Sequence, residues 1–132
     1  MQKSQPEYDV VKRSDVMVSM RDGVLLATDL YFPTRDGELV TKPLPAMMER
    51  TPYDKVRGAL RGDAAQYFAS RGYVVIYQDT RGRFNSEGQF VKYLSEPNDG
   101  YDTLEWVGNQ PWSNGKVGTF GISYGAHTQA AL

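Results

Sequence analysis

The stretch "KVGTFGISYGAH", residues 116–127, decides the fold because it joins a strand, a tight turn and a helix. Residues 116–122 predict the strand, and "YGAHTQAAL" at 124–132 predicts the start of the helix. The turn has the pattern G-x-S-x-G with Ser123 at its centre, a context that exposes the serine hydroxyl at the edge of a sheet. The pattern therefore predicts that Ser123 is a nucleophile. The alternative is a turn that holds two glycines and a serine by coincidence.

A second strand and helix are predicted upstream of this turn. "YVVIYQD" at 73–79 lacks polar alternation, which is typical of a parallel strand covered on both faces. Before it, four residues recur at the spacing of one helix face: Leu60, Ala64, Tyr67 and Phe68. Gly72 then suits the left-handed position that ends such a helix.

The amino-terminal part predicts an antiparallel hairpin. Residues 16–20 and 24–32 alternate in the manner of strands. Asp22-Gly23 between them is typical of a type I′ turn, which needs positive φ angles. Residues 33–45, with three prolines and a second Asp-Gly pair, predict a loop before a short strand at 46–50.

One more helix is predicted between the strand at 73–79 and the strand at 116–122. Asn98 or Asp99 is expected to cap it, and Tyr101, Leu104 and Val107 share one face. The order is therefore a hairpin followed by β-α-β-α-β-α. This order predicts an α/β domain in which an N-terminal antiparallel hairpin leads into a mainly parallel sheet with flanking helices.

Composition limits the function classes. The net charge of −1, with both signs interspersed, gives no basic surface for nucleic acid. The absence of cysteine and the single histidine argue against a metal site. The spacing of Gly108, Gly115 and Lys116 does not fit a nucleotide-binding loop, so no cofactor is expected. No apolar run resembles a signal peptide or a membrane span, so we expect a cytoplasmic protein, with secretion left open.

Neither His127 nor Asp79 suits the other roles of a serine mechanism. His127 follows the serine on the same short helix, whereas the base should approach from the open side of the turn and have a carboxylate partner. His127 is therefore expected to be a surface or packing residue. Asp79 precedes the serine, against the usual order of serine, acid and histidine, and is expected to form a structural clamp with Arg81. Trp106 and Trp112 are expected to pack in the core.

Four stretches of the chain resemble one family of serine hydrolases. They are "VMVSMRDGVLLATDLYFP", "RTPYDK", "RGYVVIYQDTRGRFNSEGQF" and "DGYDTLEWVGNQPWSNGKVGTFGISYG". Together they are similar to the cocaine esterase and Xaa-Pro dipeptidyl-peptidase family, from about Val16 to the last residue. The resemblance implies that residues 1–132 are the N-terminal part of an α/β-hydrolase catalytic domain, hence an incomplete α/β-hydrolase fold. It also implies a helical cap and a C-terminal β domain that these residues do not contain.

The same resemblance assigns roles to three residues. Ser123 matches the nucleophile, Tyr53 the tyrosine whose hydroxyl is one oxyanion donor, and Tyr124 the residue whose backbone N–H is the other. The acid and the base are expected beyond residue 132, so the chain alone is expected to be inactive. The implied activity is hydrolysis of an ester or amide (peptide or acyl) bond of a small molecule through an acyl-enzyme. The alternative is a non-catalytic α/β fragment or pseudo-enzyme that binds acyl compounds or partner subunits.

Overall fold

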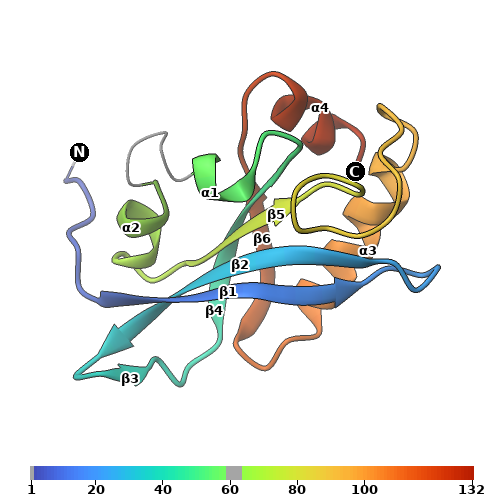
Figure 1. Cartoon of the computed structure of the whole chain (residues 1–132). Helices are drawn as coiled ribbons and strands as arrows, with labels where there is room; N and C mark the ends of the chain where they lie inside the picture. Colours follow the sequence, from blue (N-terminus) through green and yellow to red (C-terminus); the bar gives the residue numbers. More distant parts are fainter. Residues whose placement is uncertain (1, 59–63) are drawn as a thin grey trace.

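The computed structural model describes residues 2–58 and 64–132, which form one six-stranded sheet with helices on both of its faces (Figure 1). The strands are β1 (Asp9–Ser19), β2 (Leu25–Arg35), β3 (Glu38–Leu39), β4 (Leu44–Thr51), β5 (Val74–Asp79) and β6 (Ser113–Thr119). The helices are α1 (Lys55–Gly58), α2 (Ala64–Ala69), α3 (Glu96–Gly108) and α4 (Tyr124–Ala130). Over these described residues, no helix has the length and apolar character needed to cross a membrane.

The sheet has the strand order β1-β2-β5-β4-β6, with β3 paired to β2 outside this path. β4 lies between β5 and β6 and is parallel to both, whereas β2 is antiparallel to both β1 and β5. The sheet is therefore mixed, and its parallel part lies next to the serine turn. The carboxyl ends of β4 and β6 point toward the end of the sheet at which α1 and α4 lie (Figure 1).

The predicted hairpin between β1 and β2 is confirmed, but its turn is of another type. Gly23 has a φ of 84°, whereas Asp22 is not among the residues with positive φ. A type I′ turn needs positive φ at both positions, so that part of the prediction is wrong. The second Asp-Gly pair does meet this condition, with a φ of 53° at Asp36 and 80° at Gly37. It joins β2 to β3 as a tight hairpin within the stretch predicted to be a loop.

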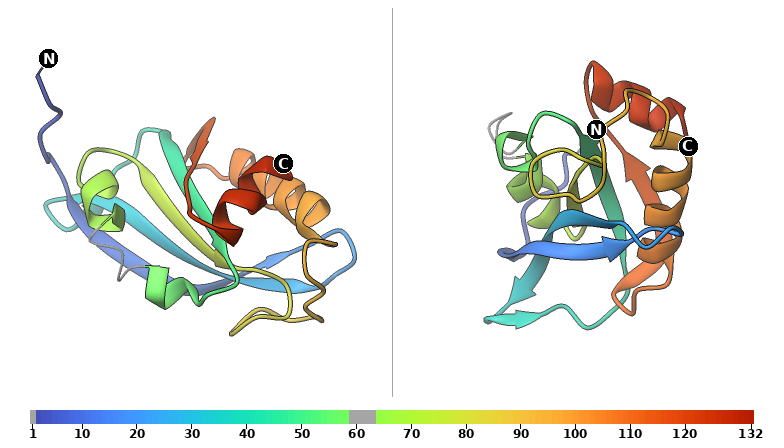
Figure 2. Two further views of the ribbon diagram at one scale, coloured as in Figure 1. Left: turned by 90° about the horizontal axis from the view of Figure 1, so that it is seen from above. Right: turned by 45° about the vertical axis from the view of Figure 1, so that its right-hand side comes forward.

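Alternation along the strands sends neighbouring residues to opposite faces of the sheet. On one face, Met48 of β4 and Ile76 of β5 share an apolar cluster with Val107 of α3. On the other face, Val75 of β5 packs with Ala69 of α2. The view from above shows α2 and α3 on opposite sides of the sheet (Figure 2). β5 is thus covered on both faces, as the apolar run at 73–79 predicted.

The helix α3 is present where it was predicted, but its start and its buried face differ. It begins at Glu96, so Asn98 and Asp99 lie inside its first turn and do not cap it. Val107 is buried and Leu104 packs against the core, as predicted, but Tyr101 is 56% exposed, and Asp99 and Thr103 are buried together with Glu96. The apolar pattern did not identify the rest of this face because three of its five buried residues are polar and find partners in the sheet or, for Asp99, in Arg81 just after β5.

The helix α2 matches the predicted pattern in part, since Phe68 packs against the core as predicted. Its buried residues are Ala65 and Ala69, whose small side chains allow the helix to lie close to β5, while Tyr67 is 48% exposed. Leu60 lies outside the described residues. Gly72 has a φ of 93°, which confirms the predicted left-handed residue after the helix.

Candidate active site at the carboxyl ends of β4 and β6

Ser123 lies on the turn between β6 and α4 with backbone angles that residues other than glycine rarely adopt. Its φ is 56° and its ψ is −122°. The amides of Ala126 and His127 donate to the Ser123 carbonyl at 2.9 and 3.2 Å, so the helix begins directly behind the serine. The residue itself is exposed. Strain of this kind persists only where the surrounding structure enforces it, and it concentrates at functional turns.

The two glycines of the pattern allow strand and helix to approach within contact distance. A Cβ on Gly121 would lie 2.8 Å from the carbonyl oxygen of Gly125, which is closer than non-bonded atoms tolerate. Gly121 also has a φ of 150°, an angle that disfavours a side chain. A Cβ on Gly125 would lie 3.3 Å from Glu49 Oε1. Steric crowding therefore explains glycine at position 121, whereas a side chain at position 125 would require only a small shift of the Glu49 carboxylate.

Tyr53 lies beside Ser123, although the two residues are 70 positions apart in the chain. The Tyr53 hydroxyl is 3.3 Å from Ser123 Oγ. The contact forms because β4 and β6 are parallel neighbours, so the segments that follow them meet at one end of the sheet (Figure 1). Tyr53 is 42% exposed, which leaves the pair open to a ligand from solvent.

Tyr124 follows the serine and is fixed by its buried side chain. Its hydroxyl accepts a hydrogen bond from the Tyr93 amide at 2.9 Å and donates one to Glu96 Oε1 at 3.3 Å. The rings of Tyr93 and Tyr124 stack with centroids 5.0 Å apart. Burial raises the pKa of Tyr124, which keeps this hydroxyl protonated at neutral pH. Its backbone amide is the first of α4, and amides at this position have no acceptor within their own helix.

A buried ion pair holds Glu96 in turn. Arg50 Nη1 lies 2.8 Å from Glu96 Oε2, and both side chains are 1% exposed. Arg50 Nε donates to Gln78 Oε1 at 2.7 Å, and Gln78 Nε2 donates to Thr28 Oγ1 at 3.1 Å. Arg50 is paired with Gln78 across β4 and β5, and Gln78 with Thr28 across β5 and β2. This arginine network therefore crosses three adjacent strands and ends, through Glu96, at Tyr124.

A second polar network, the lysine network, lies on the opposite face of the sheet. Asp29 and Asp79 each follow a member of the arginine network in the chain, so their side chains point the other way. Lys55 Nζ lies between them, 3.2 Å from Asp29 Oδ1 and 3.9 Å from Asp79 Oδ2, and 2.8 Å from Asp15 Oδ1. Burial alone would lower the pKa of Lys55, but its hydrogen bonds to Asp15 and Asp29 raise it above the ordinary value. The lysine network thus lies directly behind the loop that carries Tyr53.

The predicted clamp between Asp79 and Arg81 is wrong. Asp79 Oδ1 accepts the Lys55 amide at 2.7 Å, and burial raises the pKa of this carboxyl group. Arg81 instead forms ion pairs with Asp99 at 2.7 Å and Asp22 at 2.8 Å. The two residues have different partners because the Asp79 side chain lies on the same face of the sheet as Lys55, whereas the Arg81 side chain extends to α3 and the β1–β2 turn.

His127 and the two tryptophans have the packing roles that the sequence predicted. The His127 ring lies 4.3 Å from the ring of Tyr93 and 5.7 Å from that of Tyr124, measured between centroids. Its Nε2 is buried and has no hydrogen-bond partner among the described residues. Trp106 and Trp112 contact each other and pack against the apolar cluster under α3.

Buried charged residues around the site were not identified from the sequence, among them Arg50, Lys55 and Glu96. Arg50 ends the apolar run "AMMER", and a charge at the end of a buried strand is a signal that it has a partner. Glu96 lies in a turn-rich stretch without such a signal. Lys55 belongs to "RTPYDK", where nothing local indicates that a lysine is buried.

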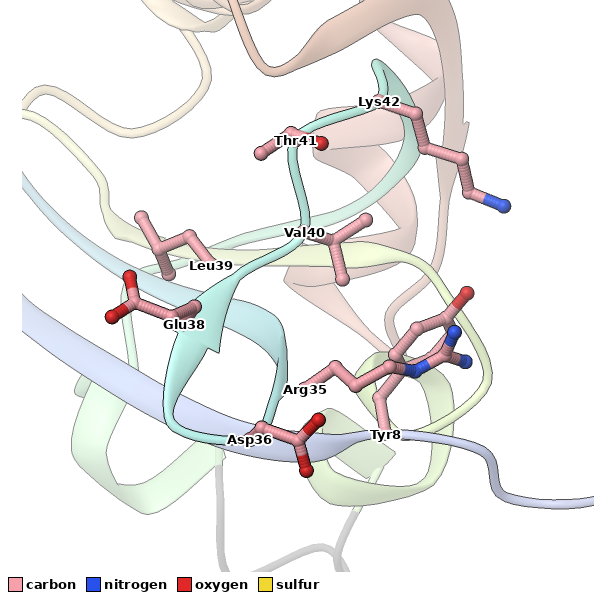
Figure 3. A pocket seen from close by; sticks show the side chains of 8 residues that line it. All are labelled: Tyr8, Arg35, Asp36, Glu38, Leu39, Val40, Thr41 and Lys42. Carbon is pink, nitrogen blue, oxygen red and sulfur yellow. The ribbon is translucent and has the colours of Figure 1, made fainter.

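A hollow of about 490 Å³ lies away from the serine turn, at the β2–β3 hairpin (Figure 3). The Arg35 guanidinium lies 4.9 Å from the centroid of the Tyr8 ring on one side of it. In Figure 1, β3 lies at the opposite end of the sheet from α4, so this hollow is separate from the candidate site. Within residues 2–58 and 64–132, no three His, Cys, Asp or Glu side chains are grouped to hold a metal ion.

Comparison with known proteins identifies relatives over nearly the whole chain. The chain is 46% identical to cocaine esterase from Rhodococcus sp. (strain MB1 Bresler) over 119 residues, which cover 88% of this chain and 20% of that protein. The structure of an alpha-amino acid ester hydrolase superposes with a TM-score of 0.75 at 32% identity, covering 99% of this chain and 24% of the other. The alpha/beta hydrolase GrgF from Penicillium sp. sh18 superposes at 0.72 and 20% identity, covering 93% of this chain and 40% of the other.

These matches agree with one another on the fold. The chain spans about a fifth of the length of the curated relatives that it matches. The likeness to GrgF shows that the sheet and its helices form part of an α/β-hydrolase fold. Residues 22–132 match the family described as X-Pro dipeptidyl-peptidase (S15 family). The chain therefore belongs to this family of hydrolases.

Proposed function

We propose that the protein is a serine hydrolase that cleaves an ester or amide bond through an acyl-enzyme formed on Ser123. The observation that carries this proposal is the 3.3 Å approach of the Tyr53 hydroxyl to Ser123 Oγ on the strained turn. Relatives named for the hydrolysis of esters and of X-Pro peptides support the bond class. The expected substrate is a small ester or a peptide or acyl amide.

The chemistry requires a base and an acid in addition to the residues described. The one histidine of the chain, His127, has its ring against Tyr93 and Tyr124. We therefore assign these roles to the complete hydrolase, by which we mean residues 1–132 together with the segment that supplies the acid and the base. The base takes the Ser123 proton while Oγ bonds to the substrate carbonyl carbon.

The developing negative charge falls on the former carbonyl oxygen. A tyrosine hydroxyl and a backbone N–H both donate hydrogen bonds, so Tyr53 and the Tyr124 amide form the oxyanion hole in this proposal. When the tetrahedral species collapses, the bond to the alcohol or amine breaks and the leaving group takes the proton from the base. Water then attacks the acyl carbon by the same route, which releases the acid product and restores Ser123.

The test uses the complete hydrolase with an activated ester and a fluorophosphonate label. Ser123→Ala should abolish both turnover and labelling, because the label reports an activated serine. Ser4→Ala, which changes an exposed serine near the amino terminus, is the matched control and should change neither. Labelling that persists in Ser123→Ala would exclude this residue as the nucleophile.

The chain of 132 residues assayed alone should not hydrolyse the ester above background. Loss of the base removes most of the rate of a serine hydrolase, even where the oxyanion hole remains. Turnover by the chain alone that disappears in Ser123→Ala would show that a base lies within these residues, and His127 would then be the candidate.

A further inference from the structure

A local distortion of the strand β1 brings Asp15 into the lysine network. The pairing of β1 with β2 shifts register between Arg13 and Val16, and Asp15 within this bulge has a φ of 53°. The Asp15 amide donates to Asp29 Oδ1 at 3.0 Å, and its carboxylate lies 2.8 Å from Lys55 Nζ. Bulges are a common means of redirecting a side chain near a functional site. Here the bulge brings a second carboxylate to an ammonium group that is already buried.

The same lysine fixes the backbone on the far side of Tyr53. The Lys55 amide donates to Asp79 Oδ1 at 2.7 Å, and the Tyr53 amide donates to Thr51 Oγ1 at 3.1 Å. The Pro52 carbonyl accepts a hydrogen bond from Arg83 Nε at 3.0 Å. The loop between β4 and α1 is therefore held on both sides of a tyrosine that is itself half exposed. Because its ring is only partly enclosed, the place of the Tyr53 hydroxyl depends on this backbone.

We propose that Lys55 is a positioning residue for the oxyanion hole, because its buried ion pairs hold the loop that places the Tyr53 hydroxyl 3.3 Å from Ser123. This inference rests on the proposed function. The arginine network holds Tyr124 from the opposite face of the sheet, so each of the two donors has its own support. Lys55 acts on one donor only, and its effect on the rate passes through the Tyr53 hydroxyl.

The test is a double-mutant cycle in the complete hydrolase, with Lys55→Met, Tyr53→Phe and the double variant. Tyr53→Phe should lower kcat about 10²- to 10³-fold, as the loss of one oxyanion donor does. Lys55→Met should lower kcat by up to about 100-fold with little change in KM, because displacement of a catalytic group by about 1 Å has an effect of this size. In the Tyr53→Phe background, Lys55→Met should cause no further loss, since the group it positions is absent.

Lys12→Met is the matched control. Lys12 Nζ also pairs with Asp29, at 3.0 Å, but its side chain is 36% exposed and it does not contact the Tyr53 loop within the described residues. It should leave kcat unchanged in both backgrounds. Should Lys55→Met fail to fold, Asp15→Asn replaces it, because the Asp15 side chain is 49% exposed and its loss is milder. The same pattern is expected, with a smaller fall in kcat.

The outcomes separate this inference from the proposed function. An equal loss of kcat from Lys55→Met, or from its replacement, in both backgrounds would mean a general structural role and would overturn the inference alone. An unchanged kcat in folded Lys55→Met would overturn it as well. An unchanged kcat in Tyr53→Phe would remove Tyr53 from the oxyanion hole and would overturn this inference, whereas the proposed hydrolysis at Ser123 is decided separately by Ser123→Ala.

Discussion

The arginine network can be tested by removing the charge of Glu96 without changing its shape. In Glu96→Gln the side chain keeps its size, but Arg50 keeps a positive charge that is 1% exposed and has lost its anion. Removing one partner of a buried ion pair costs about 3–5 kcal/mol, because the remaining charge is neither solvated nor neutralised. Glutamine can still accept a hydrogen bond, so we expect the lower end, about 3 kcal/mol.

Amide hydrogen exchange of the complete hydrolase, followed by mass spectrometry, measures this effect locally. The most protected amides of β4 and β5 should exchange more than about 100-fold faster in Glu96→Gln, since they open only when the packed sheet opens. The control is Glu7→Gln, which removes a pair 4.0 Å long whose side chains are 61% and 66% exposed. Exposed pairs contribute about 0–1 kcal/mol, so exchange in the sheet should hardly change. Equal exchange in the two variants would refute the assignment of Arg50 and Glu96 as a stabilising pair.

Two further predictions concern the serine turn and the acid stability of the domain. Gly121→Ala should abolish turnover of the complete hydrolase, because the new Cβ would lie 2.8 Å from a carbonyl oxygen. The control is Gly108→Ala, whose new Cβ would have no atom within 4 Å and which should leave activity unchanged. Full activity in Gly121→Ala would contradict the steric argument. The hydrogen bonds from Arg21 hold the pKa of Asp102 below its usual 3.8. The contribution of this carboxylate to folding stability is therefore complete above about pH 4, and it disappears as the pH falls through the lowered pKa of the folded protein. Acid unfolding followed by circular dichroism should therefore be less steep below about pH 4 in Asp102→Asn, and an identical profile would contradict this assignment.

Local patterns predicted the elements that position the site, whereas the contacts that hold them in place were not predictable. The strand, turn and helix around Ser123 follow from glycine spacing and a buried apolar run, both of which are properties of short segments. The burial of Arg50 and Lys55 depends on which strands become neighbours, because a charge is buried only where tertiary structure supplies its partner. Gln78 contacts Arg50 and Thr28 contacts Gln78 because three strands pair side by side, which no single segment encodes. The predicted type of the β1–β2 turn was wrong for a similar reason. The two Asp-Gly pairs look alike in the sequence, and only the pairing of the strands decides which of them forms a two-residue hairpin.

The adjacency of β4 and β6 has a consequence for the order in which the site is synthesised. A chain leaves the ribosome amino end first, so β4 and Tyr53 are made before β6 and Ser123. The contact between Tyr53 and Ser123, the bulge at Asp15 and the ion pairs on both faces of the sheet all lie within one continuous run of residues. Tyr53 therefore meets Ser123 only after β6 has been made and has paired with β4.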